Sequence, residues 1–482
     1  MTFVSIIRIA TSLVAIIGGM QIIPLITAIC CHEYSVILPF VIPMACSAVL
    51  FLAINIPFRG KKFNLNSKTT FIAVAVAWIS ACFYGSFVIY FSGAVSSYTD
   101  AFFESASGFS TTGATVIDDV ESLPRSINLW RCMTHWLGGM GIVALTVALL
   151  PLLGVGGFQL IKAETSGPEK GKITPKIATT AKYLWFMYMG FTAVETVLLM
   201  VFGMDFIDAL SHAFSTLGTG GFSTRNSSIG YYNSLGIEIV ITVFMFLAGI
   251  NFSMYYYALT KKFRDIRENS EFKCYLLIVF VAILVVALST LGYYGNFWKA
   301  LRYSSFQVLS ILTTAGFGIS DYTLWPSISQ FIILFLFFVG GSSGSTAGGI
   351  KIIRWVVLGK LLKNETKVML HPQGIFSIRL NNSTIRKEVL TSVVAFMVLY
   401  LGLVVFNAIL ACIAGFDLLT AFSLSASMVG NIGPAFGQLG PTHTLSVLPA
   451  FLKWFYSFAM LAGRLELYTM IIFFMPEYWR NR

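Results

Sequence analysis

Long apolar runs are the feature that most limits what this chain of 482 residues can fold into. A helix needs roughly 17–25 mainly apolar residues to cross the hydrocarbon core of a bilayer. We expect spans near 3–29, 36–57, 71–93, 128–153, 182–203, 236–259, 274–292, 325–363 (interrupted), 389–413 and 449–475. Only 11% of the residues are charged, against about 25% in ordinary globular chains. The sequence therefore predicts an all-α polytopic membrane protein.

The positive charge of the chain gathers in four segments between these spans. Residues 58–70, 154–182, 260–273 and 351–388 hold most of the 32 Lys and Arg residues, and all four fall on one side of the predicted topology. Basic loops of membrane proteins face the cytoplasm, which predicts that both termini do as well. A patch for anionic lipid remains an alternative. The excess charge flanks spans in short loops, so we expect membrane lipid and no nucleic acid as its surroundings.

Four segments on the opposite side of the membrane align without gaps. They read DAFFESASGFSTTGAT from Asp100, DALSHAFSTLGTGGFS from Asp208, YSSFQVLSILTTAGFG from Tyr303 and TAFSLSASMVGNIGPA from Thr420. The alignment superimposes Ser107, Ser215, Ser310 and Ser427, then Thr111, Thr219, Thr314 and Asn431, then Gly113, Gly221, Gly316 and Gly433. The helices that follow share a centre, which reads LGGM, LAGI, VGGS and LAGR. The repeating unit is a span, a half-helix, a glycine turn and a second span.

This unit sets the predicted domain organisation. Residues 1–70 form an N-terminal helix pair, and the four repeats occupy 71–160, 161–260, 261–388 (with the interrupted helix) and 389–482. Each unit crosses the membrane twice, so successive copies are parallel and surround an axis along the membrane normal. Inverted repeats would need an odd number of spans per unit. The arrangement predicts a central pore.

The glycine column suggests a path for cations. Each half-helix points its carbonyl end, the negative end of its dipole, toward the membrane centre. Non-helical backbone at that depth must be buried in protein or line water, where its carbonyl oxygens can replace the hydration shell of an ion. Aiming them requires a positive φ, which glycine adopts without strain. Close helix packing explains a single membrane glycine equally well, but it does not explain four in one register.

At these residues the sequence resembles the Trk/Ktr/HKT superfamily of potassium transporters, and within it the bacterial TrkH family. The resemblance rests on SGFSTTGAT, STLGTGGFST, LSILTTAGFG, SMVGNIGPAFG, FVGGSSGSTAGGIK and AGRLELYT. It implies K+ as the transported ion and Gly113, Gly221, Gly316 and Gly433 as filter glycines. It implies that the other carbonyl donors are Thr111, Thr112, Thr219, Gly220, Thr314, Ala315, Asn431 and Ile432. No repeat contains TVGYG, which predicts modest discrimination of potassium from sodium.

The eighth span is interrupted by GGSSGSTAGG, residues 340–349, here called loop 340–349. Gly and Ser pairs can simply kink a helix. Because the loop lies just inside the predicted filter, we interpret it as an obstruction of the path, and the resemblance implies that it is the gate. Its residues are Gly340, Gly341, Ser342, Ser343, Gly344, Ser345, Thr346, Ala347, Gly348 and Gly349.

Arg464 stands at the aligned centre of the last span, where the other repeats have Met140, Ile250 and Ser342. An arginine at this depth costs roughly 2.5–3.5 kcal/mol even on insertion scales, so it should face the pore or a partner. A static ion pair with Glu466 or Glu104 is the alternative. The resemblance implies a role in gating and an electrostatic barrier beneath the filter.

Other polar residues of the half-helices receive structural interpretations. Asp100, Asp208 and Thr420 are expected to be N-caps. The column Glu104, His212, Gln307 and Leu424 is polar in three copies, which suggests buried hydrogen bonds or bracing of the filter. His135 and His371 lack companion ligands, so neither is expected to bind metal.

The sequence contains no P-loop and no catalytic carboxylate constellation, so we expect neither an enzyme nor a nucleotide bound by this chain. The resemblance implies a homodimer in the bacterial inner membrane, regulated by a cytosolic TrkA-type ring with nucleotide-binding (RCK) domains that docks on the basic loops. A gated potassium channel is the first hypothesis. A potassium/proton or potassium/sodium symporter would need a titratable residue in the pore, for which Glu104 and His212 are the candidates. A third hypothesis, the translocating subunit of an ATP-driven pump, would need a partner ATPase.

Overall fold

The computed structural model describes residues 2–58, 67–139, 141, 177–374, 376–381, 383–471 and 475–476, and this part of the chain is almost entirely helical. Its two strands, β1 (Arg379–Leu380) and β2 (Ser383–Thr384), form a small antiparallel hairpin in which Arg379 pairs with Thr384. The predicted all-α membrane fold is confirmed, since six described helices are long and apolar enough to cross a bilayer, or seven with one bent pair.

The N-terminal helix pair is present. Helix α1 (Thr2–Met20) continues into α2 (Ile22–Cys30), and α3 (Ile37–Asn55) returns alongside α1. Between α1 and α3, Arg8 Nε donates to Asn55 Oδ1 at 3.0 Å. The pair joins the rest of the molecule through α1, which packs on α4, and through α2, which packs on α6.

Each repeat contains the three predicted helices. The first helices are α4 (Ser67–Phe91), α9 (Ile177–Val201), α14 (Ser270–Ser289) and α19 (Lys387–Ile413). The half-helices are α5 (Tyr98–Phe109), α10 (Phe206–Gly218), α16 (Phe297–Leu312) and α20 (Leu418–Gly430). The second helices are α6 (Arg125–Gly139), α11 (Leu235–Ala248), α17 (Ser327–Leu336) and α21 (Ala450–Arg464).

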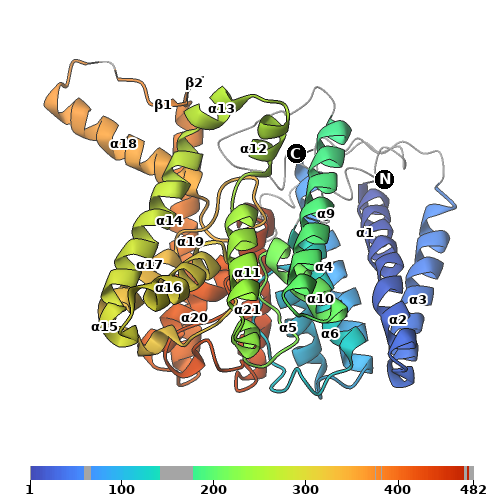
Figure 1. The fold of residues 1–482 in the computed structure, drawn as a ribbon. Helices are drawn as coiled ribbons and strands as arrows, with labels where there is room; N and C mark the ends of the chain where they lie inside the picture. The colour runs from blue at the N-terminus through green and yellow to red at the C-terminus, as the bar shows by residue number, and fades with distance from the viewer. Residues whose placement is uncertain are drawn as a thin grey trace.

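Shorter helices join these elements. They are α12 (Phe252–Leu259), α13 (Phe263–Glu268), α15 (Leu291–Tyr294), α22 (Tyr468–Ile471) and the longer α18 (Ile352–Leu370). Helix α13 and the hairpin lie at the end of the molecule where α1 starts (Figure 1), and α18 projects outward there. The half-helices lie in the opposite part of the molecule.

The four repeats close into a ring around a central pore. Helix α6 packs on α10 of the second repeat, and α11 packs on α16 of the third. The hydroxyl of Tyr322 donates to the carbonyl oxygen of Ala435 at 2.8 Å, which joins the third repeat to the fourth. Helix α21 packs on α5, so the last repeat returns to the first.

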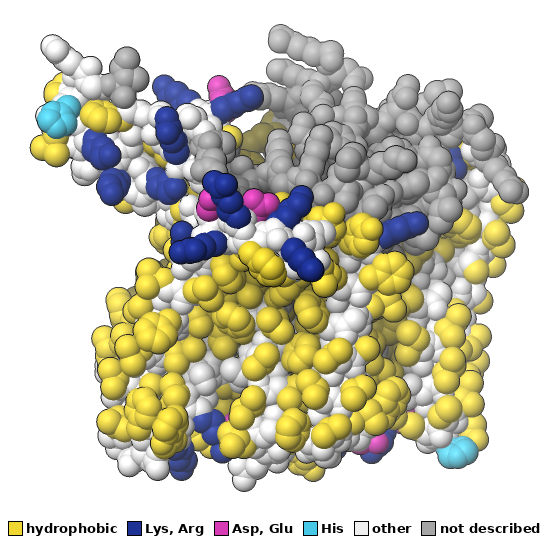
Figure 2. Space-filling view, turned by 45° about the horizontal axis from the view of Figure 1, so that its top comes forward, with side chains coloured by type: hydrophobic (Ala, Val, Ile, Leu, Met, Phe, Trp, Pro, Cys, Tyr) yellow, Lys and Arg dark blue, Asp and Glu magenta, His cyan; other side chains and the backbone are white. Residues whose placement is uncertain are grey.

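The outer surface has the pattern of a membrane protein. Figure 2 shows a broad band of hydrophobic side chains with Lys and Arg gathered along its upper edge. Large apolar side chains such as Phe186 and Phe280 are largely exposed on the first helices. Lipid is the expected surrounding of these side chains, because an exposed apolar surface of this extent is unfavourable in water.

The second helices differ from the prediction. Residues 236–259 and 449–475 were expected to be continuous spans, and both are broken: α11 and α12 meet at 91°, and α21 ends at Arg464 before α22. The predicted interruption of 325–363 is confirmed, since α17 ends at Leu336 and α18 starts at Ile352. These breaks lie at or next to the aligned glycine motifs LAGI, VGGS and LAGR. Glycine permits backbone conformations that end a helix. The later part of span 128–153 and most of the basic segments 58–70 and 154–182 lie outside the described residues.

Candidate functional site

Three of the half-helices have their N-caps three residues earlier in the sequence than predicted. Ser97 Oγ accepts from the Asp100 amide at 3.1 Å, and Asp417 Oδ2 accepts from the Thr420 amide at 3.1 Å, so Ser97 and Asp417 are the N-caps. Asp205 occupies the cap position of α10, and Asp208 lies in its first turn. The assignment of Asp100, Asp208 and Thr420 as N-caps was therefore wrong. The acids Asp100 and Asp208 form ion pairs with Lys453 and Arg225 instead.

Each half-helix ends in the same backbone bend. The four bends are residues 111–113, 219–221, 314–316 and 431–433. The glycine at the end of each has φ between +73° and +98°, as predicted from the glycine column. The first residue of each is also left-handed, with φ of 57° at Thr111, 54° at Thr219, 57° at Thr314 and 57° at Asn431. The sequence did not indicate this second column, because threonine rarely adopts the left-handed region.

The bends contact one another in cyclic order. A Cβ placed on Gly113 would overlap the carbonyl oxygen of Gly220, one on Gly221 that of Ala315, and one on Gly316 that of Ile432. A Cβ on Gly433 would lie 2.6 Å from the carbonyl oxygen of Thr112, which completes the circle. The glycines are thus required twice, once by φ and once by the close approach of the neighbouring bend. Bends far apart in the chain meet around one axis.

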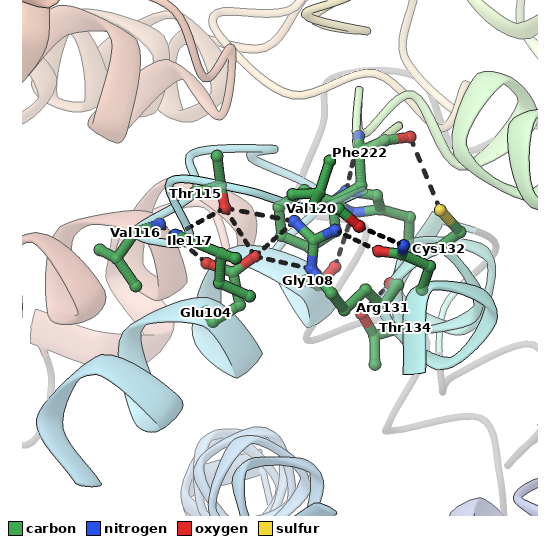
Figure 3. A network of polar contacts seen from close by, with 12 residues as sticks. Glu104, Gly108, Thr115, Val116, Ile117, Val120, Arg131, Cys132, Thr134 and Phe222 are labelled. Carbon is green, nitrogen blue, oxygen red and sulfur yellow. Dashed lines mark hydrogen bonds and ion pairs between the residues drawn. The ribbon is translucent and has the colours of Figure 1, made fainter. Parts of the chain in front are cut away.

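A buried ion pair supports the first bend (Figure 3). Arg131 on α6 donates to Glu104 Oε1 from Nε at 2.9 Å and from Nη2 at 2.6 Å. Both side chains are almost fully buried. Glu104 Oε2 accepts from the amide of Val116 at 3.0 Å, three residues beyond Gly113. The carboxylate therefore anchors the chain that leaves the bend.

The second and fourth repeats use related supports. In the second, His212 Nε2 lies 2.9 Å from the Ser223 hydroxyl, just beyond Gly221. In the fourth, where the column has Leu424, the neighbouring Ser423 hydroxyl accepts from the Phe436 amide at 3.0 Å. The expectation of buried hydrogen bonding in this column holds for Glu104 and His212 and is wrong for Gln307, whose buried amide atoms have no hydrogen-bond partner among the described residues.

His135 joins the first two repeats. Its Nδ1 lies 2.9 Å from the carbonyl oxygen of Gly108 at the end of α5, and its Nε2 accepts from the amide of Phe222 at 3.2 Å. The ring also lies against the ring of Phe222, with centroids 4.1 Å apart. Both nitrogens of this histidine are thus engaged with backbone beside two bends.

Loop 340–349 lies directly against the ends of the half-helices. The amide of Gly348 donates to Thr314 Oγ1 in the third bend at 2.7 Å. A Cβ on Gly348 would lie 2.6 Å from the carbonyl oxygen of Gly430, the last residue of α20. Within the loop, the Gly340 amide donates to Ile350 O at 2.9 Å, so its two ends are joined. Thr346 and Ala347 are buried.

Arg464 connects the loop to another repeat. Its Nη1 donates to Thr346 O at 2.6 Å, and its Nη2 donates to the carbonyl oxygens of Gly138 and Gly139 at 2.8 Å each. Arg464 therefore lies beside the loop. Of the two acids considered as ion-pair partners, Glu104 holds Arg131, and Glu466 Oε2 accepts from Arg354 at 2.5 Å. The guanidinium thereby joins the loop to carbonyl oxygens in the last turn of α6.

The comparison with known families decides which group of proteins shares this architecture. A family model described as TrkH, cation transport protein, matches residues 40–481. The chain belongs to the TrkH family. Its recognition from the filter and loop motifs is confirmed.

Relatives of the TrkH family match over the whole length of the chain. The Trk system potassium uptake protein TrkH of Escherichia coli K12 is 36% identical, with complete coverage of both chains. The protein of the same name from Vibrio parahaemolyticus is 37% identical, again with complete coverage. The crystal structure of the potassium transporter TrkH from Vibrio parahaemolyticus superimposes with a TM-score of 0.87 at 34% identity, covering 100% of both chains.

Sequence reasoning missed three charged residues of this site: Arg131, Glu271 and Arg354. All three are buried. Arg131 and Glu271 each stand within or beside an apolar span, where an ionisable residue is unfavourable without a partner. A search of every predicted span and its flanking residues for ionisable side chains, and not of the last span alone, would have identified Arg131 and Glu271 as candidates.

Proposed function

We propose that this chain is the ion-conducting subunit of a Trk-type potassium uptake system in the bacterial cytoplasmic membrane. The named relatives are potassium uptake proteins that match it from end to end. The observation that carries the proposal is the cyclic contact of the four bends. Backbone oxygens arranged around one axis can substitute for the hydration shell of a monovalent cation.

The bends supply the proposed ion ligands. Backbone carbonyls of the twelve residues 111–113, 219–221, 314–316 and 431–433 would hold K+, without an acidic side chain in any bend. The carbonyl ends of α5, α10, α16 and α20 add a negative potential at the same place. Neutral ligands suit conduction, because an ion held by full charges would leave slowly.

Loop 340–349 and Arg464 form the proposed gate. The loop contacts the third bend and the end of α20, and Arg464 places a positive charge on the loop. A cation moving inward from the bends would therefore meet both an obstruction and an electrostatic barrier. Removing residues 344–348 should increase the basal flux of reconstituted protein.

The charge distribution supports the proposed topology and offers a surface for the proposed regulatory partner. Exposed Lys261, Lys262 and Arg264 lie on or beside α13, at the basic end of the molecule. This end would face the cytoplasm, together with both termini. A TrkA-type ring with nucleotide-binding domains would dock here, against a homodimer of this chain.

Coupled symport with protons or sodium is less well supported. Its two titratable candidates serve the scaffold: Glu104 is bound by Arg131 and by the Val116 amide, and His212 contacts Asp208 O and Ser223. Glu195, a further buried acid, lies on the first helix α9 and not in a bend. These placements favour passive conduction.

Electrical recording tests the proposal. Purified protein in planar bilayers should give currents whose reversal potential follows the potassium gradient and shifts less with a sodium gradient. At symmetric potassium, a proton gradient should leave the reversal potential at zero. A reversal potential that moves with the proton gradient would instead establish symport, and absence of cation current after loop deletion would contradict the proposed function.

A further inference from the structure

The carboxylate of Glu271 contacts loop 340–349 at its entrance and the chain just beyond its exit. Glu271 lies in the first turn of α14 and is 1% exposed. Its Oε1 accepts from the amide of Ser343 at 2.5 Å and from the amide of Ile353 at 3.1 Å. One oxygen atom therefore joins two positions ten residues apart in sequence, on either side of the segment that faces the bends.

The second amide belongs to a helix N-terminus. Ile353 is the second residue of α18, and Lys351 precedes that helix in an extended conformation without a side-chain cap. The first amides of a helix lack partners within it, and a negative charge is favourable there. Glu271 thus supplies from α14 the cap that α18 does not supply for itself.

The bend between α11 and α12 holds the middle of the loop. The Ser342 amide donates to Gly249 O at 2.9 Å, and the Phe252 amide donates to Gly344 O at 3.1 Å. Thr346 Oγ1 donates to Ala248 O at 3.3 Å. The break at LAGI in the second repeat therefore exposes backbone groups that the loop uses.

The α11–α12 bend and Glu271 are the two ends of one continuous segment of the chain. Residues 252–271 run from the bend through α12 and α13 to Glu271, and α13 has no buried residue. Helix α13 lies at the end of the molecule where α18 and the hairpin also lie (Figure 1). Helix α13 is therefore connected through the backbone to both sets of residues that hold the loop.

We propose that Glu271 is a positioning residue that holds loop 340–349 across the conduction path, and that the loop is released when this contact is lost. The inference rests on the proposed function of the loop as a gate. Without the carboxylate, the amides of Ser343 and Ile353 lose their shared acceptor, and the loop keeps only its contacts with the α11–α12 bend, the half-helix ends and Arg464. Glu271 does not touch the bends, so it should act on gating and not on ion selectivity.

The test compares Glu271→Ala and Glu271→Gln with the matched control Glu388→Ala. Glu388 occupies the same position in the first turn of α19 in the next repeat and is exposed. Rubidium uptake is measured in liposomes that contain the full chain without a regulatory subunit. We expect Glu271→Ala to raise basal uptake about tenfold, the factor that corresponds to loss of one charge-assisted hydrogen bond. Glu271→Gln retains an acceptor oxygen and should restore part of the closure, while Glu388→Ala should behave as wild type.

A deletion of residues 344–348 separates the possible outcomes. When Glu271→Ala is combined with the deletion, uptake should equal that of the deletion alone. The reversal potential of Glu271→Ala by itself, measured between potassium and sodium, should equal that of wild type. Equal uptake by Glu271→Ala and wild type, in protein that elutes as a single species, overturns the inference if the deletion alone raises uptake. If the deletion itself leaves uptake unchanged, the proposed gate is wrong, and the inference falls with it. A changed selectivity in Glu271→Ala would also overturn it, since it would place the effect in the bends.

Discussion

Asn431 Nδ2 donates a hydrogen bond to Thr112 Oγ1 at 3.0 Å, between residues 319 positions apart in the chain. The same amide nitrogen lies 2.8 Å from the carbonyl oxygen of Met460 on α21. These contacts attach the fourth bend to the first and to the helix behind it. They explain why the fourth repeat has asparagine where the other three have threonine, since only the amide reaches both partners.

Replacing Asn431 with alanine should loosen the ring at its point of closure. Alanine removes both hydrogen bonds and is strained at the left-handed φ of 57°. We expect a loss of about 1–3 kcal/mol in stability, together with weaker selectivity for potassium. Thermal unfolding in detergent and reversal potentials measure the two effects. The control is Asn407→Ala in the same repeat, whose amide donates to Leu403 O within α19; equal selectivity in both variants would contradict the role of the closure.

Replacing Gly316 with serine should abolish most of the discrimination between potassium and sodium. The new Cβ would overlap the carbonyl oxygen of Ile432, so one of the two bends must move. We expect selectivity to fall by about tenfold or more, equivalent to about 1.4 kcal/mol. The same reasoning applies to Gly113 and its neighbour Gly220.

Gly402→Ser on α19 is the matched control for the filter glycines, because no atom lies within 4 Å of its Cβ position. Growth on low-potassium medium and reversal potentials should be normal for this variant. If Gly316→Ser and Gly402→Ser gave the same reversal potentials, the glycine column would have no special role in selectivity.

Replacing Arg464 with alanine should raise the basal flux without changing selectivity. The change frees Thr346 O in the loop and the carbonyl oxygens of Gly138 and Gly139, and it removes a positive charge from the path. Single-channel recording should show a higher open probability. Arg386→Ala, an exposed arginine before α19, serves as the control, and an unchanged open probability in Arg464→Ala would argue against a part in gating.

The Glu104–Arg131 pair should matter for stability more than for conduction itself. Leaving one buried charge without its partner costs about 3–5 kcal/mol, so Glu104→Gln and Arg131→Met should each lower the unfolding temperature strongly. The double variant should lose less than the two single changes added together. Unfolding curves of the four proteins measure this coupling, and strict additivity would show that the pair is not a unit.

Much of the fold was predictable because membrane helices obey local rules. Twenty apolar residues must form a span, and the gapless register of Gly113, Gly221, Gly316 and Gly433 identified the repeats. The breaks in the second helices were predicted only for loop 340–349, where ten small and polar residues interrupt the apolar run. The break after Ala248 lies in an apolar stretch that reads as a continuous span, and it depends on backbone partners that the loop provides.

The glycine positions that need positive φ, the places where helices can cross lipid and the fourfold repetition were set by the amino-acid sequence alone, since each follows from the chemistry of a few neighbouring residues. The order in which the bends meet, the partners of Arg131, Glu271 and Arg464, and the closure through Asn431 were decided only by the tertiary structure. These contacts join residues from different helices and loops, and those of Asn431 and Arg464 join different repeats, so no local pattern specifies which buried carbonyl or carboxylate a distant donor will reach.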